Sequence, residues 1–321
     1  MTLLDVQQLV KHFPQRGGLL GRIVGRVHAV NGVDLRIDRG EIVGVVGESG
    51  CGKSTLGKTL IRLLEPTRGS IVFDGQEITR IGHRQMMPLR RRMQCIFQDP
   101  YSALNPKMTA AAAIREVVQF HRVVSQRETR SYVDGLITRV GLRSDARDRY
   151  PHEFSGGQRQ RINIARALAV RPDFLVADEP VSALDVSIQA QILNLLMDLK
   201  NDFSLTLLFI SHDLKVVEHF CDRVLVMYLG QIVERIRCED LVAGACHPYT
   251  RALLGAIPVA DPAARSELTV LEGEVPSPRE PPRGCPFAGR CPLVESRCHA
   301  EMPPMVARNA THQVACWSIR N

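Results

Sequence analysis

The stretch Gly47-Glu48-Ser49-Gly50-Cys51-Gly52-Lys53-Ser54-Thr55 decides the fold of this chain. It follows an apolar run rich in Val and Ile, residues 41–46, which predicts a buried strand. It leads into residues 53–64, where leucines at helical spacing predict a helix. A Gly-rich turn between a strand and a helix, ending in Lys-Ser-Thr, is typical of a phosphate-binding loop. The sequence therefore predicts an α/β domain that binds nucleotide phosphates.

The residue types of this loop suit the binding of phosphate. Glycines at 47, 50 and 52 allow backbone conformations that side chains forbid, so successive N–H groups can face inward. The N-terminus of the following helix adds partial positive charge. We expect Lys53 to reach the β- and γ-phosphates and the Ser54 hydroxyl to ligate Mg²⁺. A Gly-rich turn before an ordinary helix is the alternative, and it leaves the register of Lys-Ser-Thr unexplained.

A second apolar run, Phe174 to Ala177, ends in the acidic pair Asp178 and Glu179. An Asp in this position can hold Mg²⁺ through water, and a Glu beside it can polarise an attacking water. The two acids could instead simply close the strand and cap the turn at Pro180. The phosphate loop in the same chain favours the first interpretation, with Glu179 as general base.

The segment Phe154-Ser155-Gly156-Gly157-Gln158 lies between these motifs, and its Ser155 precedes the acidic pair by 23 residues. In this order the motifs resemble those of the ATPase subunits of ABC transporters, over essentially the whole chain. The resemblance implies a RecA-like P-loop core with an antiparallel β subdomain, an inserted α-helical subdomain and a small Cys-containing C-terminal extension. It also implies that the segment opens a helix, expected over 158–168, whose N-terminus points at the γ-phosphate held by a second ATPase subunit.

The resemblance assigns further residues. Phe13 corresponds to the aromatic residue that stacks on adenine, although a Phe in a strand is often a core residue. Gln98 corresponds to the Q-loop glutamine, Asp185 to the D-loop aspartate, and His212 to the switch histidine, for which a role in closing a strand is the alternative. The implied sets are as follows: catalytic Glu179, His212 and Gln98; ATP-binding Phe13, Gly47, Glu48, Ser49, Gly50, Cys51, Gly52, Lys53, Ser54 and Thr55; facing the second ATP, Ser155, Gly156, Gly157 and Gln158; and Mg²⁺-binding Ser54, Gln98 and Asp178.

Composition limits where the protein works. The chain has 321 residues with 45% hydrophobic content, enough for a sizeable core and more than one domain. No apolar run reaches the roughly 18 residues that span a bilayer, and the N-terminus has no signal-peptide pattern. We expect a peripheral protein on the cytoplasmic side of the inner membrane. The net charge of +7 fits ATP phosphates, lipid headgroups or partner loops, and no nucleic-acid recognition motif accompanies it.

The organisation along the chain follows from these motifs. Residues 187–200 predict an amphipathic helix, and Leu229-Gly230 predicts the turn of a hairpin. The predicted parts are the first part of the ATPase core at 1–98, the helical subdomain at 99–171, the second part of the core at 172–246, and the C-terminal extension at 247–321.

The extension holds four of the nine cysteines, Cys285, Cys291, Cys298 and Cys316. In a cytosolic protein a local group of cysteines favours metal binding over disulfides. The spacing C-x5-C-x6-C-x17-C is wider than in common zinc fingers, and four thiolates can hold Zn²⁺ or an iron–sulfur cluster.

Three stretches narrow the resemblance to the ATPases of oligopeptide and dipeptide importers. They are the segment that begins His247-Pro248-Tyr249-Thr250, the run 271–278, and the Cys-Pro motifs at 285–286 and 291–292. Some members of that group carry a [4Fe-4S] cluster at such cysteines. We expect a cluster here, with Zn²⁺ or unligated thiols as alternatives.

The sequence thus predicts an ATP hydrolase that powers the import of di- or oligopeptides, with ATP and Mg²⁺ as cofactors. The implied partners are a second, different ATPase, two transmembrane permease subunits and, indirectly, a solute-binding protein. Nickel chelates and glutathione-like solutes are alternative cargoes. A soluble ABC ATPase of DNA repair or translation, or a regulatory module with vestigial ATP use, is a further alternative. A single phosphate loop, the absence of heptads and the intact catalytic residues argue against these last two.

Overall fold

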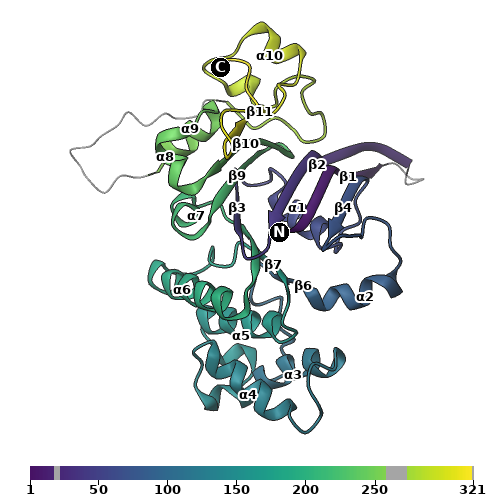
Figure 1. Cartoon of the computed structure of the whole chain (residues 1–321), viewed down its shortest axis with the longest axis vertical. Helices are drawn as coiled ribbons and strands as arrows, with labels where there is room; N and C mark the ends of the chain where they lie inside the picture. Colours follow the sequence, from purple (N-terminus) through teal and green to yellow (C-terminus); the bar gives the residue numbers. More distant parts are fainter. Residues whose placement is uncertain (18–21, 258–272, 320–321) are drawn as a thin grey trace, which may run out of the picture. The chain divides into compact units, whose positions relative to one another are not determined.

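The computed structural model describes residues 1–17, 22–257 and 273–319 of the chain. These residues form two compact units (Figure 1). The first unit consists of Met1–Ile37, Ile42–Thr79 and Ile210–Asn321, and the second of Asp38–Glu41 and Arg80–Phe209. No helix within the described ranges is long and apolar enough to cross a membrane.

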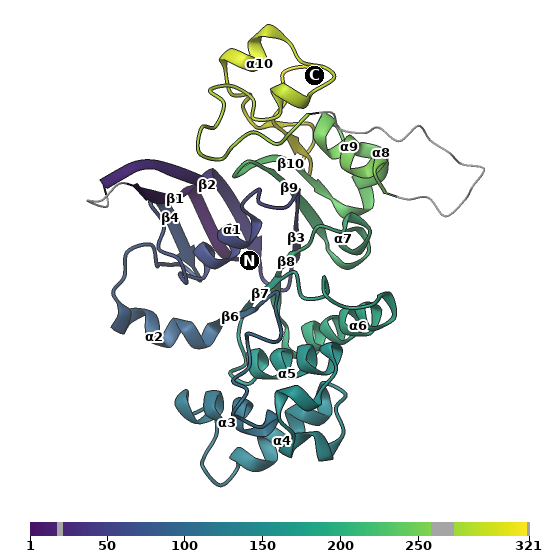
Figure 2. The ribbon, with the colours of Figure 1, turned by 180° about the vertical axis from the view of Figure 1, so that it is seen from behind.

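The first unit contains the predicted antiparallel β subdomain. Its four-stranded sheet has the order β2-β1-β4-β5, in which β1 pairs antiparallel with β4 and β4 with β5. Figure 2 shows α1 beside this sheet. The bounds are β1 Thr2–Gly17, β2 Arg22–Asp38, β4 Arg68–Phe73, β5 Gln76–Glu77 and α1 Lys53–Leu60.

Helix α1 is shorter than the predicted helix over 53–64. It ends at Leu60 because Arg62 has a left-handed backbone, with φ of 56°, and a residue in that conformation commonly terminates a helix. The guanidinium of Arg62 then donates to the carbonyls of Ile78 and Thr79, which fixes the turn after the helix.

A second set of strands in the first unit places the predicted loop. The fully buried β3, Ile42–Val46, runs parallel to β9, and β9 pairs antiparallel with β10. Leu229 and Gly230 join β9 and β10 with φ of 44° and 79°, as a two-residue hairpin turn requires. Helix α7 packs on β3 and β9, and α8 on β10. The bounds are β9 Arg223–Tyr228, β10 Gln231–Arg237, α7 Leu214–Phe220, η3 Cys238–Asp240 and α8 Leu241–Gly244.

The C-terminal extension adds to this unit and shares its core. Strand β12 pairs antiparallel with β10, and β11 with β12. Phe287 is fully buried, with ring centroids 5.4 Å from both Tyr228 and Tyr249. Burying one such side chain stabilises a fold by roughly 1.5–3 kcal/mol. The extension therefore relies on the core of the first unit. Its bounds are α9 Pro248–Gly255, η4 Ala288–Arg290, α10 Ser296–Ala300, β11 Val306–Ala307 and β12 Gln313–Val314.

The second unit carries helices around the fully buried strands β7 and β8 and the partly buried β6. Strand β6 runs parallel to β7, which is the pattern expected from apolar strands with helices on both sides. Helices α3, α4 and α5 pack against one another, and α5 also lies against β6 and α6 (Figure 1). The bounds are α2 His83–Arg92, β6 Met93–Ile96, α3 Ala110–Phe120, α4 Thr129–Arg139, η1 Ser144–Asp148, η2 Pro151–Glu153, α5 Gly156–Leu168, β7 Phe174–Asp178, α6 Val186–Phe203 and β8 Thr206–Ile210.

One buried histidine makes the stability of the first unit depend on pH. His247 is 1% exposed, and its Nδ1 accepts the N–H of Tyr249 at 3.1 Å, which caps α9. Burial disfavours the charged ring and lowers the pKa of His247 from 6.5 to about 4. The folded protein therefore keeps this ring neutral at a pH where the unfolded chain is protonated. Its contribution to stability is complete above pH 6.5 and is lost as the pH falls from 6.5 toward 4.

We predict that the free energy of unfolding falls by about 2 kcal/mol between pH 7.5 and 5 because of this group. The variant His247→Asn keeps a capping acceptor and does not titrate, so it should lose that part of the pH dependence. Urea unfolding of both proteins at pH 7.5, 6 and 5 measures the difference. Parallel curves for the two proteins would contradict the assignment.

Candidate active site

The main chain of the phosphate loop lies very close to the main chain of neighbouring residues in the first unit. Gly47 has φ of 152° and Gly52 of 107°. A Cβ atom at Gly47 would lie 2.1 Å from the carbonyl oxygen of Met227, and one at Gly52 would lie 2.0 Å from that of Ala29. Both positions therefore require glycine, because main-chain atoms occupy the space that a side chain would need.

The lysine of the loop points across its interior. Lys53 is 4% exposed, and its Nζ donates to the carbonyl oxygens of Gly47 at 2.8 Å and Glu48 at 3.0 Å. Cys51 is buried next to it, and burial raises the pKa of its thiol. The cysteine is therefore a small neutral side chain in the loop, as its position suggests.

Two other predicted residues lie in this unit. Phe13 is half-buried in β1, so it is not a core residue, and the Nζ of Lys11 lies 4.8 Å from its ring centroid. His212 lies two residues after the end of β8 and is exposed. Phe13, the loop, His212 and the four C-terminal cysteines thus belong to the first unit, whereas Gln98, residues 155–158, Asp178, Glu179 and Asp185 belong to the second.

The second unit brings Gln98 and Glu179 into contact. Asp178 is the buried last residue of β7, and Glu179 follows it with a left-handed φ of 47°. The Nε2 of Gln98 donates to the Oε2 of Glu179 at 3.0 Å. A left-handed backbone is uncommon for a residue with a long side chain, costs about 1–3 kcal/mol and is frequent at functional sites. The conformation turns the Glu179 carboxylate toward Gln98.

The residues Ser155-Gly156-Gly157-Gln158, here called the signature segment, begin α5 two residues earlier than predicted, at Gly156 rather than Gln158. The cause is a reciprocal cap: the N–H of Gln158 donates to the Ser155 hydroxyl at 3.4 Å, and the N–H of Ser155 donates to the Gln158 side-chain oxygen at 3.1 Å. Ser155 and Gln158 are both exposed. The spacing of a Ser and a Gln three residues apart is a sequence signal for this helix start, and it fixes the start at Gly156.

The two glycines of the signature lie against the D-loop region. A Cβ atom at Gly157 would be 2.5 Å from the Cγ2 of Ile188, and one at Gly156 would be 3.4 Å from a methyl group of Leu184. Asp185 caps α6 by accepting the N–H of Ile188 at 3.0 Å. Packing inside the chain therefore already requires a glycine at 157, whereas Gly156 has more room.

The four C-terminal thiols gather in the first unit as reduced cysteines. Cys285 and Cys298 are buried, Cys291 and Cys316 are half-buried, and the N–H of Cys285 donates to the carbonyl of Cys298 at 2.7 Å. Burial raises the pKa of Cys285 to about 11, and the three neighbouring thiols add to the rise. The four side chains are thus close enough to affect one another electrostatically.

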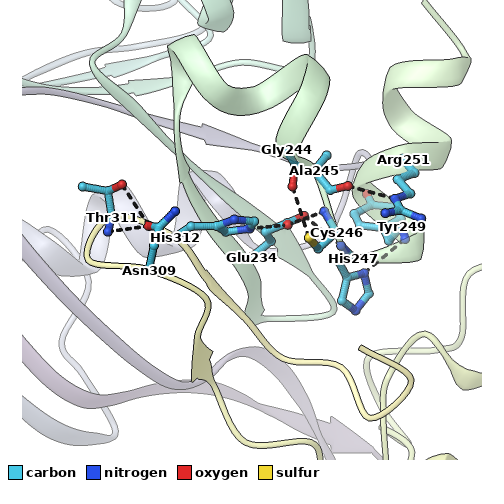
Figure 3. Close-up of polar contacts among 10 residues, drawn as sticks. All are labelled: Glu234, Gly244, Ala245, Cys246, His247, Tyr249, Arg251, Asn309, Thr311 and His312. Atoms are coloured by element: carbon cyan, nitrogen blue, oxygen red, sulfur yellow. Dashed lines mark hydrogen bonds and ion pairs between the residues drawn. The ribbon is translucent and has the colours of Figure 1, made fainter. Parts of the chain in front are cut away.

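A different group of metal-binding residue types lies nearer together. Within the described part of the chain, only Glu234, Cys246 and His312 place three donor atoms within 4.8 Å of one another. Figure 3 shows the Glu234 carboxylate between His312 and the start of α9. Its Oε1 accepts from the N–H of Cys246 at 2.7 Å and contacts the Nε2 of His312 at 2.8 Å, and its Oε2 accepts the N–H of His247 at 3.2 Å. These hydrogen bonds satisfy the buried carboxylate, so the group ties the tail to β10 and α9.

Comparisons with known proteins agree with this geometry. The family described as "ABC transporter" matches residues 30–182, and the one described as "Oligopeptide/dipeptide transporter, C-terminal region" matches residues 233–298. The chain is 49% identical to "Oligopeptide transport ATP-binding protein AppF" of Bacillus subtilis (strain 168), over 98% of this chain and 97% of the relative. It is 52% identical to "Probable peptide ABC transporter ATP-binding protein y4tS" of Sinorhizobium fredii, over 98% and 89%.

Solved structures show the same fold. The ATP-binding cassette MJ0796, solved as a dimer bound to ADP and Pi, superimposes with a TM-score of 0.66 at 27% identity, covering 74% of this chain and 99% of that one. The CbiO1 structure from Clostridium perfringens gives a TM-score of 0.65 at 28% identity, covering 76% and 91%. These similarities confirm the predicted fold class and the predicted resemblance.

The two loop glycines at 50 and 52 offer a matched test of the close approach. Both have positive φ, but a Cβ at Gly50 meets nothing within 4 Å, whereas one at Gly52 meets Ala29. We predict that Gly50→Ala costs about 1 kcal/mol of unfolding free energy from backbone strain alone. Gly52→Ala should cost more, about 2–4 kcal/mol, because main chain must also shift. Equal losses in urea unfolding would contradict the geometry.

Proposed function

The chain belongs to the ATP-binding proteins of ABC transporters, and we propose that it hydrolyses ATP to power the import of di- or oligopeptides. The chain is 49% and 52% identical, over nearly its full length, to proteins named for peptide transport, and this similarity supports peptides as the cargo. The match of the C-terminal region to the oligopeptide/dipeptide type also supports it.

The observation that carries the catalytic proposal is the hydrogen bond from Gln98 to Glu179. Glu179 is the general base that takes a proton from the attacking water, and Gln98 orients both the carboxylate and that water. The strained backbone of Glu179 holds its carboxylate in this place. We assign His212 as the residue that contacts the γ-phosphate.

The phosphate loop supplies the binding half of the site. Backbone N–H groups of the loop and the ammonium of Lys53 hold the phosphates, and Phe13 stacks on the adenine. Ser54, Gln98 and Asp178 are the residues that would hold Mg²⁺. The ion would supply positive charge that neutralises the phosphate oxygens.

The signature segment points to an assembly of two ATPase subunits. Ser155 and Gln158 are exposed at the start of α5, where the first N–H groups of a helix have no partner inside it and attract an anion. This helix end binds the γ-phosphate held by a second, different ATPase subunit, with Asp185 at the same junction. The chain therefore carries halves of two sites and hydrolyses ATP slowly when alone.

The ATPase pair works on two transmembrane permease subunits, which receive peptide from a solute-binding protein. Closure of the pair around ATP moves the permease through contacts near Gln98, and hydrolysis resets it. The protein is thus peripheral, on the cytoplasmic side of the membrane.

We predict that Glu179→Gln lowers ATP turnover of the assembled transporter by about 10²–10⁴-fold, because the amide cannot accept the proton of the water. ATP binding should remain. The matched control is Glu116→Gln, which changes an exposed carboxylate on α3 in the same unit. Phosphate release measures the turnover. Equal turnover in Glu179→Gln and Glu116→Gln would reject the assignment of Glu179 as the general base.

We propose that the four thiols of the extension hold a [4Fe-4S] cluster rather than a single zinc ion. Zinc bound tetrahedrally with Zn–S of about 2.3 Å would hold its sulfurs about 3.8 Å apart. No three of the four cysteines have all their sulfurs within 4.8 Å of one another in the described structure. We assign Cys285, Cys291, Cys298 and Cys316 as the cluster ligands, and the electrostatic effect of the other three thiols on the pKa of Cys285 supports this assignment. A cluster would contribute a covalent staple to a segment with little core of its own.

Anaerobically purified protein should be brown and contain about four irons per chain. Cys298→Ser should lose this iron, whereas Cys246→Ser should keep it, because Cys246 lies in the Glu234 group instead. Iron content and the visible absorption spectrum report both. Colourless protein with stoichiometric zinc would show that the thiols bind zinc and not a cluster. Retention of iron in Cys298→Ser would show that Cys298 is not a ligand.

A further inference from the structure

The phosphate loop receives an ion pair from the C-terminal extension. The two terminal nitrogens of Arg290 donate to the two carboxylate oxygens of Glu48, at 2.7 and 3.1 Å. The Arg290 side chain is 7% exposed and that of Glu48 is 25% exposed. A forked, two-bond pair with one partner buried is geometrically specific and stronger than a surface ion pair.

A second residue of the same region holds the main chain of Glu48. The N–H of Glu48 donates to the hydroxyl oxygen of Tyr249 at 2.8 Å. Tyr249 is fully buried, and its ring packs against Tyr228 at 4.7 Å and Phe287 at 5.4 Å. The hydroxyl of Tyr228 in turn accepts from Arg290 at 3.3 Å. Both the backbone and the side chain of Glu48 are therefore fixed by residues outside the loop.

Glu48 links these contacts to the phosphate-binding lysine. Its carbonyl oxygen accepts the Nζ of Lys53 at 3.0 Å, and that of Gly47, the preceding residue, accepts it at 2.8 Å. A shift of Glu48 would therefore move one of the two oxygens that orient Lys53. The contacts run from Arg290 through Glu48 to Lys53, all within the first unit.

Arg290 also lies within the cysteine segment. It ends the short helix η4, between Cys285 and Cys291, and this turn is held by N–H donation from Ala288 to Cys285 at 3.1 Å and from Cys291 to Ala288 at 3.4 Å. A change in how the two cysteines are held would therefore alter the position of Arg290.

We infer that Arg290 is a positioning residue for the phosphate loop, through which the Cys285–Cys291 segment acts on ATP binding. This inference rests on the proposed ATP site. The extension pre-organises the entrance of the loop at Glu48, so that Lys53 is in place before the nucleotide arrives. Loss of the ion pair weakens ATP binding and leaves the catalytic residues of the second unit unchanged.

The test compares ATP affinity and turnover in the assembled transporter for wild type, Arg290→Ala, Arg290→Lys and Glu48→Gln. We expect Arg290→Ala to raise the KM and Kd for ATP about tenfold, which corresponds to about 1.4 kcal/mol. The kcat at saturating ATP should stay within about threefold of wild type, because the base and water site are untouched. Arg290→Lys keeps the charge without the fork and should lie in between.

The matched control is Arg297→Ala, which removes another arginine of the extension. Arg297 pairs with Glu301 at 3.1 Å on the surface, and both side chains are more than half exposed. Its loss should leave KM and Kd for ATP unchanged. The double variant Glu48→Arg with Arg290→Glu restores an ion pair of opposite direction and should recover part of the affinity.

Unfolding temperature and iron content of each variant separate positioning from misfolding. If Arg290→Ala does not fold, Glu48→Gln keeps the shape of the pair, removes one charge and should still raise the KM. Wild-type affinity in both Arg290→Ala and Glu48→Gln would overturn the inference, as would a fall in kcat with an unchanged KM. A wild-type transporter that neither binds nor hydrolyses ATP would instead overturn the proposed function.

Discussion

The close approach of main chain to main chain at Gly47 and Gly52 is the constraint on which the first unit depends. Met227 O and Ala29 O occupy the positions where side chains at these two residues would lie. Met227 belongs to β9 and Ala29 to β2, so the loop is wedged between strands of both sheets of this unit. The phosphate loop is therefore shaped by its packing partners as much as by its own flexible residues.

The extension shows how a segment without its own core becomes part of a larger one. Phe287 enters the aromatic cluster of Tyr228 and Tyr249, β12 extends the sheet at β10, and His312 reaches the buried Glu234 (Figure 3). Each of these contacts joins the C-terminal residues to β9, β10 or α9. Removal of His312 would take away one of the three partners of the buried Glu234 carboxylate and would therefore also destabilise β10 and the start of α9.

Sequence patterns predicted the local features of the fold and of the site. The loop, the acidic pair after β7 and the hairpin at Leu229-Gly230 each depend on neighbours a few residues away, and the structure places them as expected. The early end of α1 was not predictable from leucine spacing, because a left-handed Arg62 overrides it. The early start of α5 was predictable from the Ser155–Gln158 spacing.

Contacts between residues far apart in the sequence could not be predicted from such local patterns. Arg290 and Glu48 are 242 residues apart, and nothing in the local sequence of either pairs them. The need for glycine at 157 likewise depends on Ile188 of another helix.

The packing of Gly157 against Ile188 sharpens what the signature segment must satisfy. If the two glycines served only to let a partner's phosphate approach, a Cβ atom at either position would meet no atom of this chain. A Cβ atom at Gly157 would instead collide with Ile188 of α6. Gly157 thus sets the distance between α5 and α6, and the Asp185 cap fixes the start of α6 beside it. Ser155 and Gln158 stay exposed at the start of α5. The short segment therefore meets two requirements at once, because Gly157 packs against α6 while the residues on either side of the two glycines remain accessible.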